Sequence, residues 1–210
     1  MSSKRYTEEF KVEAVRQVTD RGHSVAEVAD RLGVSIHSLY TWRKQYGRSG
    51  PERAATADQA DTAGRVAVAR ALFREYARAI GTDLEYQGFI AELAALPGPY
   101  VPPRGALLLA YVDGDEVAGC VALRPLDGTA GEMKRLYVRP EYRSAGLGRR
   151  LVEAVIGAAK DAGYRELRLD TLADMAAAQA LYRRLGFVEI PPYNTDHLPG
   201  TRFFALDLTA

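Results

Sequence analysis

Cysteine is almost absent from this chain of 210 residues, because Cys120 is the only one. A single cysteine cannot form an intramolecular disulfide, so nothing in the sequence requires an oxidising compartment. Zinc clusters built on several cysteines are excluded for the same reason, and we predict no metal site. The length is enough for one medium domain with a sizeable core and a small appendage.

Long apolar runs are missing as well. The chain has no stretch of about 18 apolar residues, so no membrane span is expected. The first ten residues, MSSKRYTEEF, lack the apolar segment of a signal peptide. The predicted location is therefore the cytoplasm.

The chain also lacks a strong net charge, since the total is +1. Its distribution is uneven, because residues 1–50 hold nine Lys/Arg and six Asp/Glu, whereas the remainder holds nineteen against twenty-one. A mildly basic head on a nearly neutral body fits a head that touches phosphates. It also fits a chance excess of three charges.

What is present begins with residues 7–47, whose spacing predicts three short helices. Residues 24–27, SVAE, form a capping box that starts the second helix. Gly33 ends that helix, and Ser35 is placed to cap the third. Two helices joined by a short turn, with polar residues on the second, are typical of a helix-turn-helix that binds DNA.

Residues 48–64 contain no large aliphatic or aromatic side chain, so they cannot bury enough surface to fold alone. We predict a linker at 49–64, between a head domain (1–48) and a body (65–210). The body mixes hairpins with a β-α-β-α-β-β run, which favours an α/β (α+β) fold with a mixed sheet. Its predicted helices are 68–80, 85–96, 147–163 and 176–187, and its predicted strands are 106–112, 116–124, 131–138, 166–171, 187–190 and 202–208.

The stretch RSAGLGRR, residues 143–150, joins a predicted strand to a predicted helix. Glycines there let backbone N–H groups approach a ligand, and a helix N-terminus favours anions, so phosphate is the expected guest. Neither the Walker pattern nor the three-glycine dinucleotide pattern fits this loop, since Leu151 stands where a third glycine is needed. Alone, two glycines before a helix are a weak signal.

The surrounding sequence makes the signal specific. MKRLYVRPEYRSAGLGRRLVEAVIGAAKDAGYRELRLDT (133–171) and ALYRRLGFVEI (180–190) closely resemble the GNAT superfamily of N-acetyltransferases. The resemblance covers roughly 66–210 and implies a mixed β-sheet flanked by helices that binds acetyl-CoA as co-substrate. In that family the loop binds the pyrophosphate, and the preceding strand splays from its neighbour and pairs with the pantetheine arm. The loop residues implied here are Arg143, Ser144, Ala145, Gly146, Leu147 and Gly148, and the strand residues are Leu136, Tyr137 and Val138.

Acetyl transfer to an amine needs a base, a donor for the oxyanion and an acid for the leaving sulfur. The resemblance makes Glu132 the candidate base and Tyr182 the candidate acid, with backbone N–H groups of the splayed strand polarising the thioester. Glu132 is equally explained as a charged residue at a strand end, and Tyr182 as a core residue of its helix. Arg135 and Arg139 are expected to be solvated.

The acceptor side is less specific. Residues 190–200, IPPYNTDHLPG, resemble a loop found in one branch of the family, which makes Tyr193 and Asn194 candidate contacts for the acceptor amine. Its prolines also fit a tight connection. Met175 replaces an asparagine that many members carry. GNAT domains usually open with a β-strand, for which residues 52–56, ERAAT, are a weak substitute; a domain without that strand would have an unpaired sheet edge.

Residues 4–47 closely resemble the DNA-binding head of OrfA-type insertion-sequence transposases, and LYTWRKQY (39–46) is the most specific part. The resemblance implies that the third helix enters the major groove. Three-helix units also serve as packing modules, which is the alternative. The residues implied in contacts with bases or phosphates are Ser35, His37, Ser38, Thr41 and Lys44, and those implied in backbone contacts are Arg43, Arg5 and Lys4.

The sequence thus predicts an acetyl-CoA-dependent N-acetyltransferase with an appended DNA-binding head. Its acceptor is a primary amine on a small molecule or a protein, its other partner is DNA, and no membrane is involved. A homodimer is compatible with both parts. The alternative is a transposase-derived DNA-binding protein whose acetyltransferase-like body is inactive or senses a ligand.

Overall fold

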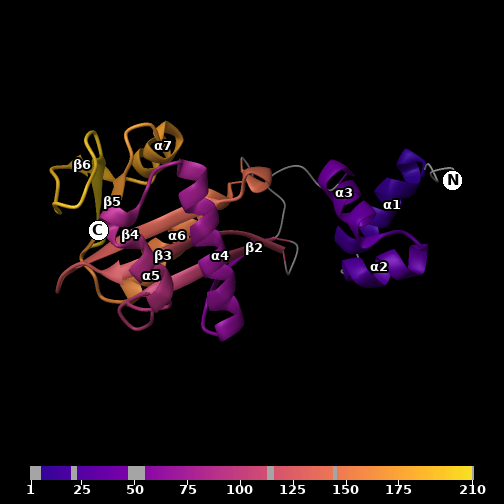
Figure 1. The fold of residues 1–210 in the computed structure, drawn as a ribbon, viewed down its shortest axis with the longest axis horizontal. Coiled ribbons are helices and arrows are strands. Elements are labelled where there is room, and N and C mark those ends of the chain that lie inside the picture. Colours follow the sequence, from indigo (N-terminus) through magenta and orange to yellow (C-terminus); the bar gives the residue numbers. More distant parts are fainter. Residues whose placement is uncertain (1–5, 20–22, 47–54, 113–115, 144–145, 210) are drawn as a thin grey trace. The chain divides into compact units, whose positions relative to one another are not determined.

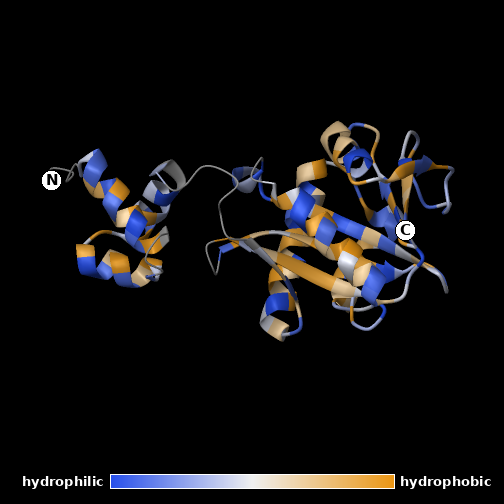
Figure 2. Ribbon diagram, turned by 180° about the vertical axis from the view of Figure 1, so that it is seen from behind, coloured by the Kyte–Doolittle hydropathy of each residue, from blue (hydrophilic) through white to orange (hydrophobic). Residues whose placement is uncertain are grey.

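A computed structural model describes residues 6–19, 23–46, 55–112, 116–143 and 146–209 (Figure 1). The chain divides into two compact units, Met1–Ala54 and Ala55–Ala210. In Figure 2 the helices are banded with hydrophobic and hydrophilic residues, as expected for helices that cover a core with one face. No helix of the described part combines the length and the apolar character needed to cross a membrane.

The first unit holds the three predicted helices, α1 (Glu8–Thr19), α2 (Val25–Leu32) and α3 (Ile36–Tyr46). The predicted capping box is present, because the Ser24 hydroxyl accepts from the Glu27 amide while the Glu27 carboxylate accepts from the Ser24 amide. Gly33 ends α2 in the left-handed region, at φ 62°. Buried side chains from the three helices form the core of this unit: Ala14, Val15, Val25, Val28, Ala29, Leu39 and Trp42.

The second unit is built on a seven-stranded sheet with the order β1-β2-β3-β4-β5-β7-β6. Only β4 and β5 run parallel, and the other neighbours are antiparallel. The predicted mixed sheet is therefore confirmed. The strands are β1 (Ala55–Gln59), β2 (Ala106–Val112), β3 (Glu116–Pro125), β4 (Ala130–Val138), β5 (Glu166–Thr171), β6 (Val188–Ile190) and β7 (Arg202–Asp207).

Strand β1 corrects the prediction of a linker at 49–64, and it supplies the first strand that the sequence left open. Ala55–Gln59 pairs antiparallel with β2 along its whole length. The Gln59 side chain accepts a hydrogen bond from the Leu107 amide, and Thr62 caps the helix that follows. An edge strand needs backbone pairing more than bulk, so a segment without large apolar residues can still complete the sheet. The second unit begins at residue 55, not 65.

Helices cover both faces of the sheet. On one face lie α4 (Ala63–Ile80), the short helix η1 (Glu85–Gln87) and α5 (Phe89–Ala95). On the other lies α6 (Leu147–Asp161), and α7 (Ala176–Arg184) adds Tyr182 to the same core. A second short helix, η2 (Pro140–Tyr142), follows β4. The sheet between these layers carries the residues discussed next.

Candidate functional site

The parallel strands β4 and β5 separate along their length. They pair only from Ala130 to Glu132, opposite Glu166 to Arg168, and the rest of β4 has no partner on β5. On its other side β4 shifts register against β3 between Cys120 and Ala122. Within this bulge Arg135 adopts φ 57°, a conformation rare for a residue with a side chain. The sheet therefore opens into a gap beyond Glu132.

A cavity of about 770 Å³ lies at this opening, and the predicted cofactor residues line it. Residues from the splayed strand and from the glycine loop meet there, although the two segments are separate in the sequence. Ser144 and Ala145, also predicted to hold the pyrophosphate, lie outside the described residues. The predicted residues among the lining are Leu136, Tyr137, Val138, Arg143, Gly146, Leu147 and Gly148.

The N-terminus of α6 forms one wall of this larger cavity. Gly146 caps the helix at φ 75° and has no side chain to satisfy the first N–H groups. Among the described residues, the first backbone bond into this helix is donated by the Arg150 amide to the Gly146 carbonyl, and the amides of a first helical turn have no acceptor within their own helix. Arg143 is tied to β4, because its Nε donates to the Val138 carbonyl at 3.0 Å. The arrangement suits an anion such as a pyrophosphate.

A smaller cavity of about 290 Å³ adjoins the larger one, and the two share lining residues that include Tyr76, Leu136 and Met175. It lies deeper between β4 and β5, with Lys134 and Asp170 on its wall. Met175 occupies the position where many members of the resembled family carry an asparagine. Because Met175 lines both cavities, each has a thioether in place of that side-chain amide.

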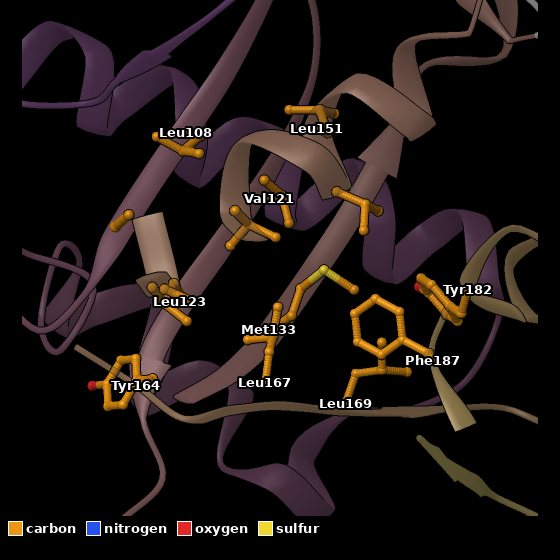
Figure 3. Packing of buried hydrophobic residues seen from close by; sticks show 14 of the residues in the cluster. Leu108, Val121, Leu123, Met133, Leu151, Tyr164, Leu167, Leu169, Tyr182 and Phe187 are labelled. Atoms are coloured by element: carbon orange, nitrogen blue, oxygen red, sulfur yellow. The ribbon is translucent and has the colours of Figure 1, made fainter. Parts of the chain in front are cut away.

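Tyr182 lines the smaller cavity and is 5% exposed. Its ring packs beside Phe187 (Figure 3). The ring centroids of Phe187 and Phe204 lie 5.8 and 6.1 Å from that of Tyr182. Burial raises the pKa of Tyr182 above its usual range, so the phenol stays protonated at neutral pH. The residue is thus both a core residue and a potential proton donor to the cavity.

Glu132 lies outside the residues that line either cavity. It is 1% exposed, and its Oε2 accepts from Arg124 Nε at 2.7 Å. Its Oε1 accepts from the Tyr193 hydroxyl at 2.9 Å and lies 3.7 Å from Lys134 Nζ. The structure therefore brings Glu132 and Tyr193 together, but it does not place either on the cavity wall.

The second predicted acceptor residue, Asn194, is also absent from the lining of the smaller cavity. Its Oδ1 is buried and has no hydrogen-bond partner among the described residues. Burial and the Glu132 carboxylate raise the pKa of Tyr193 above its usual range, which fits a hydroxyl that donates to Glu132. The loop between β6 and β7 thus packs over Glu132.

On the first unit, the predicted DNA contacts fall into different environments. His37 and Thr41 are exposed on α3. Ser35 accepts from the Ser38 amide at 2.9 Å and caps the helix, and the two hydroxyls are 2.8 Å apart. Lys4, Arg5 and the Lys44 side chain lie outside the described residues.

Arg43 corrects a prediction, because it is only 3% exposed and its guanidinium lies over the Tyr40 ring. It faces the interior of the unit, and a side chain buried in this way is not placed to contact a phosphate. Sequence reasoning missed Ile36 and Tyr40, which are 50% and 43% exposed on the same helix as His37. The i, i+4 spacing was the available signal. Ile36 and Tyr40 are four residues apart, as are His37 and Thr41, so the two pairs lie next to each other on the surface of the helix.

A family model described as "Acetyltransferase (GNAT) family" matches residues 66–187, more than half of the chain. The chain belongs to this family. A second model, described as "Transposase", matches residues 1–78.

Individual proteins agree with both matches. An uncharacterised N-acetyltransferase of Schizosaccharomyces pombe is 38% identical over 139 residues, which cover 66% of this chain and 85% of that protein. The candidate transposase YkgN of Escherichia coli is 52% identical over 66 residues, which cover 31% of this chain and 56% of YkgN. The structure of yncA from Salmonella typhimurium with its cofactor acetyl-CoA has a TM-score of 0.51 at 23% identity, and covers 74% of this chain and 94% of that one.

The GNAT domain also contains a buried polar network that sequence reasoning missed. Lys134 Nζ donates to Asp170 Oδ1 at 2.8 Å, and Gln87 Nε2 donates to Asp170 Oδ2 at 3.2 Å. Gln87 Oε1 accepts from Arg135, which also forms an ion pair with Glu92 at 2.5 Å. Burial alone would raise the pKa of Asp170, but Lys134, Arg135 and Gln87 together outweigh it and hold that pKa below its usual range.

Arg135 was expected to be solvated, and this prediction is wrong. Its side chain is 3% exposed because η1 and α5 fold over it. Arg139 forms a bidentate ion pair with Glu75 and is partly buried.

The pairing of Lys134 with Asp170 left one signal in the sequence, the alternation of side chains along a strand. Each of the two residues lies two positions beyond the last paired residue of its strand, β4 or β5, so both side chains lie on the same face of the sheet.

Proposed function

We propose that this protein transfers the acetyl group of acetyl-CoA to a primary amine by direct attack on the thioester, and that its head binds DNA. The observation that carries the enzymatic part is the pair of adjoining cavities between β4 and β5. The larger one joins the N-terminus of α6 to the splayed strand, and the smaller one ends at Tyr182.

The larger cavity suits acetyl-CoA. The pyrophosphate lies against the amides of Gly146, Leu147 and Gly148, where a helix N-terminus stabilises negative charge. The pantetheine arm runs along Leu136, Tyr137 and Val138, whose edge is left unpaired by the splay from β5. A Cβ added at Gly146 would meet no described atom within 4 Å, so the space above this residue is open.

In the chemical step, the amine nitrogen forms a bond to the acetyl carbon while the carbon–sulfur bond breaks. Tyr182 protonates the leaving sulfur, as its protonated state allows. Backbone N–H groups of β4 stabilise the oxyanion. Glu132 reaches the cavity only through Lys134, so we propose that it positions Lys134 and does not take the proton directly.

Changing Gly146 to alanine is expected to weaken acetyl-CoA binding about tenfold, because the left-handed conformation costs a residue with a Cβ roughly 1–2 kcal/mol. In the variant, the free loop leaves the left-handed conformation at residue 146, and acetyl-CoA binding must restore it at the cost of binding energy. Calorimetric titration of the full chain with acetyl-CoA measures the effect. Gly157→Ala is the matched control, because Gly157 lies within α6 with open space around its Cβ. Equal dissociation constants for the two variants would contradict the loop assignment.

The head is proposed to bind duplex DNA through α3. His37 and Thr41 are exposed on this helix, α2 and α3 are joined by a turn at Gly33, and the segment matches the transposase model. A helix exposed in this way can enter a major groove. The rival function, DNA binding with an inactive or ligand-sensing body, is distinguished by turnover, since such a body releases no coenzyme A thiol whether or not it binds acetyl-CoA.

DNA affinity is expected to fall as the salt concentration rises, because binding to phosphates releases counterions. Fluorescence anisotropy with a labelled duplex, repeated from low to high salt, gives the slope. Lys44→Ala is expected to weaken binding to all sequences and to reduce the slope by about one. Lys160→Ala, an exposed lysine on α6, is the control and leaves both unchanged. A salt-independent affinity would rule out this role for the head.

A further inference from the structure

Asp170 has a special place in the smaller cavity, because it is the only carboxylate among the described residues that line it. Its side chain is 9% exposed and is held from two sides, by Lys134 on one oxygen and Gln87 on the other. A carboxylate oxygen can accept two hydrogen bonds, so each oxygen retains one free acceptor position. The group is therefore fixed in orientation and still able to bind a donor.

The cations beside Asp170 are already occupied. Lys134 contacts Asp170 at 2.8 Å and lies 3.7 Å from Glu132. Arg135 is engaged by Glu92 and Gln87. Arg143, which reaches both cavities, is bonded to the Val138 carbonyl at the loop end, where the pyrophosphate is proposed to lie. Of the three cations that line the smaller cavity among the described residues, Lys134 and Arg135 are thus already paired with carboxylates, and Arg143 is assigned to the pyrophosphate, so none is left for a ligand carboxylate next to the amine.

The rest of the wall is largely apolar. Aliphatic, thioether and aromatic side chains surround the polar group, and a volume of about 290 Å³ is at the small end for ligand pockets. These residues are Tyr76, Ile80, Leu84, Leu169, Leu172 and Met175.

We infer that the smaller cavity takes a small primary amine on an apolar body, without a carboxylate beside the amine, and that Asp170 accepts a hydrogen bond from that amine. This inference rests on the proposed acetyl transfer and names its acceptor class. Lys134, 2.8 Å from Asp170, opposes a second positive charge at this point, so the amine binds as the free base. Its lone pair is then available to attack the thioester.

Atoms and electrons balance in this step. The nitrogen bonds to the acetyl carbon and the carbon–sulfur bond breaks, with its electron pair going to sulfur. Asp170 takes the proton that nitrogen loses and passes it to solvent, while Tyr182 protonates the sulfur and is reprotonated from solvent. The products are the N-acetylated amine and coenzyme A with a free thiol.

Matched acceptor pairs test the class on the full, unmodified chain. Tyramine is compared with tyrosine, phenethylamine with phenylalanine, and isopentylamine with leucine, because each pair differs only in the carboxylate. Release of the coenzyme A thiol gives the rate, and mass spectrometry identifies the product. The expected kcat/KM is about 100-fold higher for at least one amine than for its amino acid, since a buried carboxylate without a partner is costly.

Amino acids that react as well as the amines, or a chain that binds acetyl-CoA but acetylates no amine of the panel, would overturn the inference and leave the proposed transferase standing. A chain that does not bind acetyl-CoA at all overturns both. Calorimetric titration with acetyl-CoA separates these two failures.

Asp170→Asn tests the residue itself. The KM for the amine is expected to rise about tenfold or more, with the KM for acetyl-CoA unchanged, because a hydrogen bond to a charged group is lost. Asp161→Asn, at an exposed carboxylate at the end of α6, is the control and changes neither constant. The stoichiometry of acetyl-CoA binding corrects for any unfolded fraction. An unchanged KM for the amine would overturn the role of Asp170, whatever its effect on stability.

Discussion

Glu92→Ala is expected to lower the free energy of unfolding of the GNAT domain by about 3–5 kcal/mol. The change leaves the Arg135 guanidinium, on a side chain that is 3% exposed, without its ion-pair partner. It also removes the acceptor of the Tyr100 hydroxyl, a fully buried residue. Two buried donors lose their bonds to Glu92 at once, although Arg135 keeps its bond to Gln87, so the effect should exceed that of an ordinary surface ion pair.

Urea unfolding of the full chain measures this change. The only tryptophan, Trp42, lies in the core of the head, so its fluorescence reports the head, whereas circular dichroism reports both units. The dichroism transition should shift and the fluorescence transition should not. Glu153→Ala, which breaks the exposed pair with Arg149, is the matched control and should cost less than about 1 kcal/mol. Similar losses in the two variants would mean that the buried pair adds little.

Tyr182→Phe is expected to reduce kcat about 100-fold while the dissociation constant of acetyl-CoA stays nearly unchanged. The substitution removes the proposed donor to the leaving sulfur and keeps the ring that packs on Phe187 and Phe204. Steady-state rates with an accepted amine, together with calorimetric binding, separate the chemical step from binding.

Tyr164→Phe is the matched control for this experiment. Tyr164 is 4% exposed and belongs to the same core, but its hydroxyl donates to the Arg104 carbonyl, away from the cavities. Its loss should lower stability and leave kcat unchanged. A Tyr182→Phe variant with the rate of the unchanged protein would show that Tyr182 is only a core residue.

Local signals in the sequence predicted much of this fold. Capping residues and turns such as Ser24 and Gly33 act on their own neighbours, so the helices of the head could be placed directly. The glycine loop and the long helix after it likewise depend on contiguous residues. The cavity at the splayed strand followed from the family resemblance, and the structure brings Leu136–Val138 and Gly146–Gly148 to one wall.

Features set by partners distant in the sequence escaped prediction. Strand β1 is held by backbone hydrogen bonds to β2, which lies about 50 residues later in the chain. Backbone hydrogen bonds do not depend on side-chain type, so the composition of residues 55–59 does not indicate the pairing. Arg135 is buried because Glu92 and Gln87 come from another segment, and charge alone suggested solvent. Asp170 meets Lys134 only because β4 and β5 run side by side before they part. Arg43 in the head is a further case. Its charge suggested a solvent-exposed side chain, but it is buried with its guanidinium over the Tyr40 ring.

The opening between β4 and β5 has a consequence for how long the protein lasts. Beyond Glu132 the edge of β4 has no partner on β5, and in the proposed complex the pantetheine arm lies along that edge, where a neighbouring strand would otherwise pair. Binding to the folded state alone adds about 2.7 kcal/mol of stability when free ligand is at 100 times its dissociation constant. If acetyl-CoA binds as proposed, the resistance of the GNAT domain to proteolysis should therefore rise with the acetyl-CoA concentration.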